Sequence, residues 1–294
     1  MPPNPRGAAT LAGSCVTLHT MSDMIEPVRA AIAERHAGLL ISCERLRDYA
    51  IAMKSPWGGR GINADAPHEQ MLVIVLSRSL NTYWSATELA RMGFGPQAVM
   101  LNRSLFEDMI DAHWITVEPT LAVQRIDEHQ LHGRMLLADA VRAEGLPEAE
   151  LVTFDPAERS SLDGIFGEYG DRSWTGLGVH SRVMAVEHLW EPEEGGRPLL
   201  HFYRRFVQRE SNQILHLSAF SMTGQVRERT ATELTVALGP SADEYVGKAL
   251  VASFYCFGQL ISLVRDTFGF GDAEGWREIY DRPLGEIHTA VEDT

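Results

Sequence analysis

Apolar residues recur three, four or seven positions apart along most of this chain, and this spacing constrains the fold more than any other feature. Within 22–52 they stand, among other positions, at Ile25, Val28 and Ile32, which is the period of one helical face. Strict alternation of apolar and polar residues, the period of a half-buried strand, is nearly absent, and Glu233–Leu238 is the best candidate for extended structure. The pattern predicts an all-α fold.

Proline and glycine indicate where these helices begin and end, because proline is tolerated in a first turn and glycine is favoured just beyond a last one. On this basis we expect helices over 22–52, 67–92, 96–117, 120–144, 179–190, 198–222, 241–268 and 273–281. The glycines between 164 and 178 predict a short helix followed by an irregular, glycine-rich loop. The whole is expected to be a multi-helix bundle.

The chain shows neither a repeat of fixed period nor a long polar linker, so we expect residues 22–294 to form a single composite helical domain. The segment 1–21 is rich in proline and small residues and lacks the apolar stretch of a signal peptide. It is expected to be a disordered or misannotated leader, with Met21 or Met24 as the true start. The longest unbroken apolar run, Met71–Leu76, is far short of the roughly 20 residues that span a bilayer. These features predict a cytoplasmic protein without a membrane partner.

Charge and cysteine content exclude several classes of function. The 294 residues hold 40 acidic and 26 basic side chains, for a formal charge of −14. This field repels phosphate backbones at long range, which excludes a general nucleic-acid coat protein but leaves room for a local basic patch. Cys15, Cys43 and Cys256 are far apart and odd in number, so they encode neither a disulfide framework nor a cysteine zinc site. A glycine-rich phosphate loop, His-Glu-x-x-His and Gly-x-Ser-x-Gly are all absent.

One helix presents Glu128, His129 and His132 within a single turn. Helical spacing would place Glu128 beside His132, but a metal ion would need further ligands from elsewhere. A solvated polar face is the better interpretation, and we predict neither a metal nor a cofactor.

The helix expected over 198–222 carries the most informative polar side chains. Seven residues of a regular α-helix turn about 700°, so Arg209 and His216 should point within about 20° of each other. Their face is otherwise apolar, and the side chains expected in the core on this helix and on the one at 96–117 are Phe202, Phe206, Phe220, Leu105, Phe106 and Ile110. Buried polar groups cost a few kcal/mol unless they are paired. The cluster is therefore either a hydrogen-bonded structural network or a site lined by a guanidinium and an imidazole.

A second polar cluster stands at Asn102–Asp108. Arg103 and Glu107 are four residues apart and could form an intrahelical ion pair worth a few tenths of a kcal/mol. Alternatively, Glu107 crosses the bundle to orient Arg209 or His216, and it is the leading acid to pair with Arg209. The sequence leaves both arrangements open.

Three short motifs resemble an uncharacterised bacterial family of helical domains of unknown function. They are Arg-Ser-Leu-Phe-Glu at 103–107, Ser-Trp-x-Gly at 173–176, and a helix with Tyr203 and the segment Ser211–His216, in this order. The resemblance covers roughly residues 30–265 and implies an all-helical fold with no established activity.

The spacing of Arg209 and His216, with six residues between them, is similar to the Arg-x(4–6)-His pattern of HEPN-type ribonucleases. The resemblance implies a toxin or defence enzyme that cleaves single-stranded RNA without a metal, with an active site completed across a homodimer. The imidazole would act as acid or base and the guanidinium would stabilise the charged phosphorane. The residues expected to be catalytic are Arg209, His216 and Glu107, and those expected to bind substrate are Arg103, Gln213, Trp174 and Tyr203.

Two other classes of function remain open at this point, so the sequence does not decide whether the protein is an enzyme. One is a non-catalytic helical interaction or scaffold protein with a partner protein. The other is a small-molecule-binding protein or enzyme that uses a pocket near Trp174, Tyr203 and His216.

Overall fold

The computed structural model describes residues 21–53, 63, 65–145, 154–168, 173–190, 198–215, 226–229, 234–236, 239–242, 244–270 and 272–292. Helices dominate these residues, so the predicted all-α, multi-helix fold is confirmed. The first part of the chain forms α1 (Met21–Arg35), α2 (Ala37–Ala52), α3 (Pro67–Arg91), α4 (Gly95–Val117), α5 (Pro119–Ala143), α6 (Pro156–Phe166) and α7 (Val179–Val186). The second part forms α8 (Pro198–Phe202), α9 (Asn212–Leu215), α11 (Glu244–Phe268), α12 (Ala273–Trp276) and α13 (Arg282–Glu292).

Three segments depart from α-helical geometry. A 3-10 turn, η3 (Glu187–Leu189), follows α7, and two π-helical segments, η4 (Tyr203–Ser211) and η5 (Arg277–Asp281), continue α8 and α12. The only sheet in the described residues pairs β1 (Val226–Arg229) antiparallel with β2 (Leu234–Val236), with Val226 opposite Val236. Strand β2 falls within the segment 233–238, which the sequence had marked as the best candidate for extended structure.

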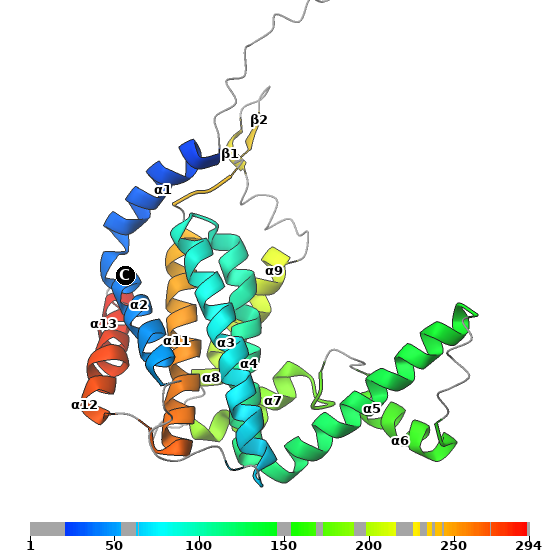
Figure 1. Cartoon of the computed structure of the whole chain (residues 1–294). Helices are drawn as coiled ribbons and strands as arrows, with labels where there is room; N and C mark the ends of the chain where they lie inside the picture. The colour runs from blue at the N-terminus through cyan, green and yellow to red at the C-terminus, as the bar shows by residue number, and fades with distance from the viewer. Residues whose placement is uncertain are drawn as a thin grey trace, which may run out of the picture.

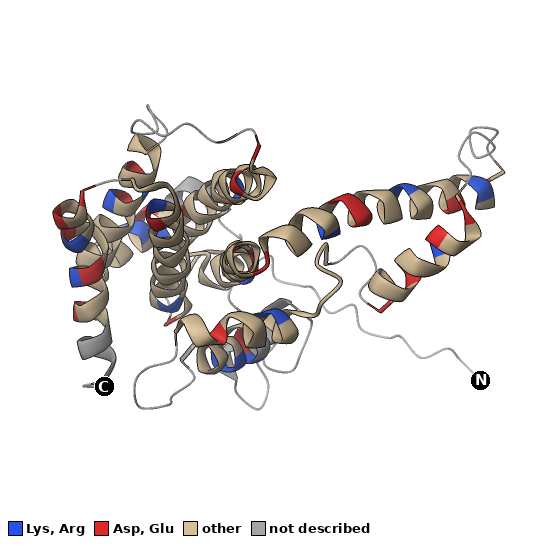
Figure 2. Cartoon of the chain, turned by 90° about the horizontal axis from the view of Figure 1, so that it is seen from below, with Lys and Arg blue, Asp and Glu red and all other residues tan. Residues whose placement is uncertain are grey.

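Helices α3, α4 and α11 lie side by side at the centre of the bundle (Figure 1). On one side they are covered by α1, α2, α12 and α13, and on the other by α7, α8, η4 and α9. Helices α5 and α6 leave this body as a projecting hairpin, which we call the arm (Figures 1 and 2).

The main core forms between the three central helices and the elements on both sides of them. Leu105, Phe106 and Ile110 are fully buried there and Phe206 is buried, as predicted, while Phe202 packs half-buried against them. Phe220 lies outside the described residues. The arm has a small core of its own, centred on Met135, Leu162 and Phe166.

Helix α11 alone, among the described helices, has the length and hydropathy of a segment that could cross a membrane. Most of that apolar stretch is buried against α3 and α4, which is the position of a core helix. Polar residues interrupt its apolar residues, so α11 lacks the unbroken apolar run expected of a membrane span in the sequence.

Most helix ends fall where proline and glycine predicted them. Pro67 and Pro119 begin α3 and α5, and Gly93 follows α3 with a φ of +85° that favours glycine. The helix expected over 22–52 is instead broken at His36, whose φ of −119° and ψ of 25° are not helical. The short helix expected over 273–281 continues through η5 and α13 to Glu292.

Candidate functional site

A buried ion pair links the central helix α4 to α7. The Arg182 guanidinium contacts the Asp111 carboxylate, and its Nη2 lies 3.3 Å from Oε2 of Glu107. Arg182 is 2% exposed, so one buried cation contacts two carboxylates, of which Asp111 is buried and Glu107 is half-buried. Burial raises the pKa of Asp111, and the Arg182 charge opposes that shift.

The loop before α7 is tied to the same carboxylate. Trp174 donates a hydrogen bond from Nε1 to Oδ2 of Asp111 at 2.8 Å, and its ring packs edge-on against Trp114. Ser173 donates to the carbonyl of Leu177 at 2.7 Å, which closes the turn. Trp174 therefore has its polar atom engaged inside the protein, a structural role that differs from the substrate contact predicted for it.

Arg103 extends this network toward the π-helix η4. Its Nε donates to Oε1 of Glu107 at 3.1 Å, and its Nη1 donates to the side-chain oxygen of Asn212. Asn212 is the first residue after η4. The Tyr203 ring, at the start of η4, stacks on Phe106 with ring centroids 5.9 Å apart. We call the chain of contacts from Trp174 through Asp111, Arg182, Glu107 and Arg103 to Asn212 the ion-pair ladder.

Four of the predicted site residues, Arg103, Glu107, Trp174 and Tyr203, thus lie together around α4. The predicted pairing of Glu107 with Arg209 is wrong, because Glu107 contacts Arg103 and Arg182 instead. Both oxygens of Glu107 are engaged, one by Arg103 and one by Arg182, so Glu107 holds these two arginines in place. A direct catalytic role does not fit these contacts. The side chain of Gln213 and all of His216 lie outside the described residues.

The π-helix explains why Arg209 is not where the sequence placed it. The expectation assumed 100° per residue, but hydrogen bonds in a π-helix span five residues, so each turn takes up more residues than an α-helical turn. Arg209 consequently leaves the stripe of Phe202 and Phe206 and is exposed to solvent. The interpretation of Arg209 as part of a buried network is therefore wrong.

Three arginines, Arg204, Arg205 and Arg209, form an exposed basic face on η4. None of them makes an ion pair with another described residue. Residues four or five positions apart lie one turn above each other in a helix of this kind, so Arg209 follows the other two along one side. The adjacent Glu210 has its Oε1 3.5 Å from Nζ of Lys248, so its negative charge is partly offset by a lysine on α11.

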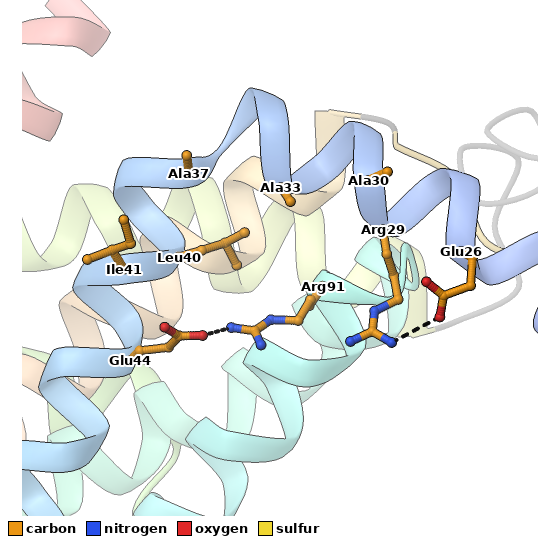
Figure 3. Close-up of a pocket in the computed structure, with 9 residues that line it drawn as sticks. All are labelled: Glu26, Arg29, Ala30, Ala33, Ala37, Leu40, Ile41, Glu44 and Arg91. Atoms are coloured by element: carbon orange, nitrogen blue, oxygen red, sulfur yellow. Dashed lines mark hydrogen bonds and ion pairs between the residues drawn. The ribbon is translucent and has the colours of Figure 1, made fainter.

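A groove of about 540 Å³ lies on the other side of the bundle, between α1, α2 and the end of α3 (Figure 3). Its apolar lining comes from alanines together with Leu40 and Ile41. Its charged residues form ion pairs within the groove, Arg91 with Glu44 and, at 3.3 Å, Arg29 with Glu26. None of the predicted site residues lines this groove, and its charges are already neutralised in pairs.

The histidines of α5 are not on a solvated face, contrary to the sequence interpretation. His132 is 2% exposed and packs against the Phe166 ring, with Nε2 3.6 Å from Oδ1 of Asp163. Glu128 pairs with Arg125 at 2.6 Å. Across the described ranges, no three histidine, cysteine or carboxylate side chains are grouped as metal ligands.

Arg182 is the site residue that the sequence analysis missed, although a signal for it existed. It stands with Val179, Val183 and Val186 at the spacing of one helical face, so a charge interrupts an apolar stripe there. Only the interrupted stripe that holds Arg209 and His216 had been taken as a candidate site.

No family model matches the chain, and no curated protein or solved structure matches it either. A functional assignment therefore depends on the residues themselves.

Proposed function

We propose that this chain is a metal-independent ribonuclease of the HEPN type, which cleaves single-stranded RNA with Arg209 and His216. The observation that carries the proposal is the exposed basic face of Arg204, Arg205 and Arg209 on a π-helix. In a chain with a formal charge of −14, three adjacent exposed arginines without described ion pairs are a local exception. π-Helical turns occur frequently at functional sites.

The chemistry follows from these two side chains. The 2′-oxygen of RNA attacks the neighbouring phosphorus while the bond from phosphorus to the 5′-oxygen breaks, leaving a 2′,3′-cyclic phosphate and a 5′-hydroxyl. An imidazole such as that of His216 can take the proton from the 2′-hydroxyl or deliver one to the 5′-oxygen near neutral pH. The Arg209 guanidinium can hold two oxygens of the charged phosphorane at once.

The ion-pair ladder supports this assignment by holding the end of η4 in place. Arg103 fixes Asn212, three residues beyond Arg209, and Glu107 in turn fixes Arg103. In this proposal Arg103 and Glu107 are positioning residues. Asn212 also begins α9 (Asn212–Leu215), which His216 follows directly in the sequence.

The decisive experiment measures cleavage of a fluorescent single-stranded RNA by the full chain, with the matching DNA as a second substrate. We expect the wild type to cut the RNA in the presence of a chelator and to leave the DNA intact, because DNA lacks the attacking 2′-hydroxyl. His216→Ala and Arg209→Lys should lose most of the activity, since lysine cannot reproduce the two-pronged phosphate contact.

Matched variants separate catalysis from general damage. His188→Ala and Arg45→Lys change exposed residues on η3 and α2 and should cut RNA like the wild type. A wild-type protein that cuts no RNA would overturn the proposal and favour an interaction or scaffold protein. Full activity in His216→Ala would also overturn it.

A further inference from the structure

Helix α5 carries an apolar stripe on the face that points away from α6. The residues of this stripe follow one another at intervals of three and four, the spacing of a helix–helix seam: Val123, Ile126, Gln130, Gly133, Leu137 and Ala140. Ile126 and Met135 are nine positions apart, so the two side chains point about 180° apart on the helix. Met135 packs in the core of the arm, and the stripe therefore lies on the opposite face of α5.

Beyond the first turn of α5, where Ala122 is buried in the main core, the stripe is not covered by the described structure. Leu137 is 65% exposed, and Val123 and Ile126 are half-buried without belonging to the main core or to the core of the arm. A Cβ added at Gly133 would meet no atom within 4 Å. A helix that projects from its body with an open apolar face favours a contact with another molecule.

The charges beside the stripe indicate which molecule binds there. Asp127 and Arg134 are exposed, lie seven residues apart on one edge of the stripe, and form no ion pair within the described ranges. Several other charged residues of the arm are paired, such as Arg125 with Glu128 and Asp139 with Arg159. One acidic and one basic side chain on the same edge are complementary to a second copy of that edge.

We propose that α5 docks in antiparallel orientation on α5 of a second copy of this chain, related by a two-fold axis. In an antiparallel pair the same edge of each helix meets, so Asp127 of each copy faces Arg134 of the other and the pair forms twice. The point midway between 127 and 134 nearly coincides with the middle of α5 (Pro119–Ala143). Because Ala122 in the first turn of α5 is buried in the main core, the paired stretch runs over about 123–138, about 24 Å at 1.5 Å per residue.

This inference is independent of the ribonuclease proposal, because it uses only the arm. It also assigns a role to Gln130, the polar residue in the middle of the stripe. A polar side chain within an otherwise apolar seam selects one register and one orientation of the paired helices.

Sedimentation equilibrium and light scattering of the full chain test the proposal. We expect a dimer whose dissociation constant rises by at least about tenfold in Asp127→Arg and in Arg134→Asp, because each change places like charges opposite one another. The double variant Asp127→Arg/Arg134→Asp should recover the dimer. An equimolar mixture of the two single variants should form a heterodimer, since both charge contacts become complementary between them.

Controls make the outcome specific to this surface. Glu34→Arg makes the same change of charge at an exposed position on α1 and should leave the dimer unchanged. Leu137→Glu should give a monomer whose circular dichroism matches that of the wild type. A wild type that is monomeric at every concentration measured would overturn the proposal, as would a Leu137→Glu variant that remains dimeric.

Discussion

Arg182 and Asp111 form an ion pair in the interior of the bundle, while Arg209 stands in solvent on η4. The fold thus places two arginines in different surroundings. Arg182 compensates buried carboxylates and joins α7 to α4, whereas Arg209 is exposed and makes no ion pair with another described residue. This separation leads to opposite expectations for the two residues.

Replacement of Arg182 by methionine should strongly lower the free energy of unfolding. The change removes the cation and leaves the Asp111 carboxylate in the interior without a counter-charge, which typically costs about 3–5 kcal/mol of unfolding free energy. Arg209→Met, at an exposed site, should stay within about 0.5 kcal/mol of the wild type. Urea denaturation of both variants measures the difference, and similar losses in the two would contradict the buried position of Arg182.

The two acids that contact Arg182 should also differ. The Asp111 side chain is 12% exposed and accepts bonds from both Arg182 and Trp174, whereas the Glu107 side chain is 26% exposed. We expect Asp111→Ala to cost more unfolding free energy than Glu107→Ala, because it leaves a buried guanidinium and an indole N–H without their acceptor. Equal losses in urea denaturation would indicate that the two carboxylates share the Arg182 charge evenly.

Arg103 should contribute much less to stability than Arg182. Its side chain is 31% exposed and its ion pair with Glu107 lies within one helix, where such pairs are worth about 0.3–0.5 kcal/mol. Arg103→Met should therefore cost no more than about 1 kcal/mol, including the lost bond to Asn212. A loss as large as that of Arg182→Met would place Arg103 among the residues that hold the core together.

The helices were predictable because local signals define them. Apolar periodicity, Pro67, Pro119 and Gly93 act within a few residues of themselves, and the observed ends of α3 and α5 follow them closely. The break at His36 has no such local signal. The His36 ring lies close to Gly247 of α11, a contact between segments that are distant in the sequence.

The candidate site was only partly predictable for the same reason. Arg103 and Glu107 share a helix, so their pairing follows from spacing alone. The partnership of Asp111 with Arg182 joins segments 71 residues apart, and the exposure of Arg209 depends on the π-helical geometry of η4. Spacing rules built on a regular α-helix cannot anticipate either feature.

Two glycines give a sharp test of the packing around α11. A Cβ at Gly258 would overlap the ring of Tyr280 on η5, whereas a Cβ at Gly38 on α2 would meet no atom within 4 Å. Gly258→Ala should cost about 1–3 kcal/mol through overpacking. Gly38→Ala should instead stabilise by up to about 1 kcal/mol, because alanine has the higher helix propensity. Thermal unfolding that ranks the two variants in the reverse order would contradict the close approach of η5 to α11.

The buried carboxyl of Asp108 should make stability depend on pH in an unusual direction. Burial raises the pKa of Asp108 to about 6, although Arg78 and the hydroxyl of Ser79 oppose the shift. Because the folded state binds this proton more tightly than the unfolded state, whose carboxyl has a pKa of about 3.9, the charged form destabilises the fold above about pH 6. Asp108→Asn removes that charge and keeps an oxygen that can accept the bond from Ser79.

We therefore expect Asp108→Asn to be more stable than the wild type at pH 7, by an amount on the order of 1–3 kcal/mol. That advantage should shrink as the pH falls from about 6 to 4, where the wild-type carboxyl becomes neutral in the folded state. His113 acts in the opposite direction, because burial lowers its pKa to about 4 and the unfolded state binds its proton at a higher pH than the folded state. Acidification therefore destabilises the fold through His113. In the wild type the neutralisation of Asp108 offsets part of this loss, so Asp108→Asn should lose stability on acidification more steeply than the wild type does. Urea midpoints between pH 4 and pH 7, with the exposed Asp65→Asn as control, measure both slopes, and an advantage that grows toward pH 4 would show that the native state prefers the Asp108 carboxylate charged.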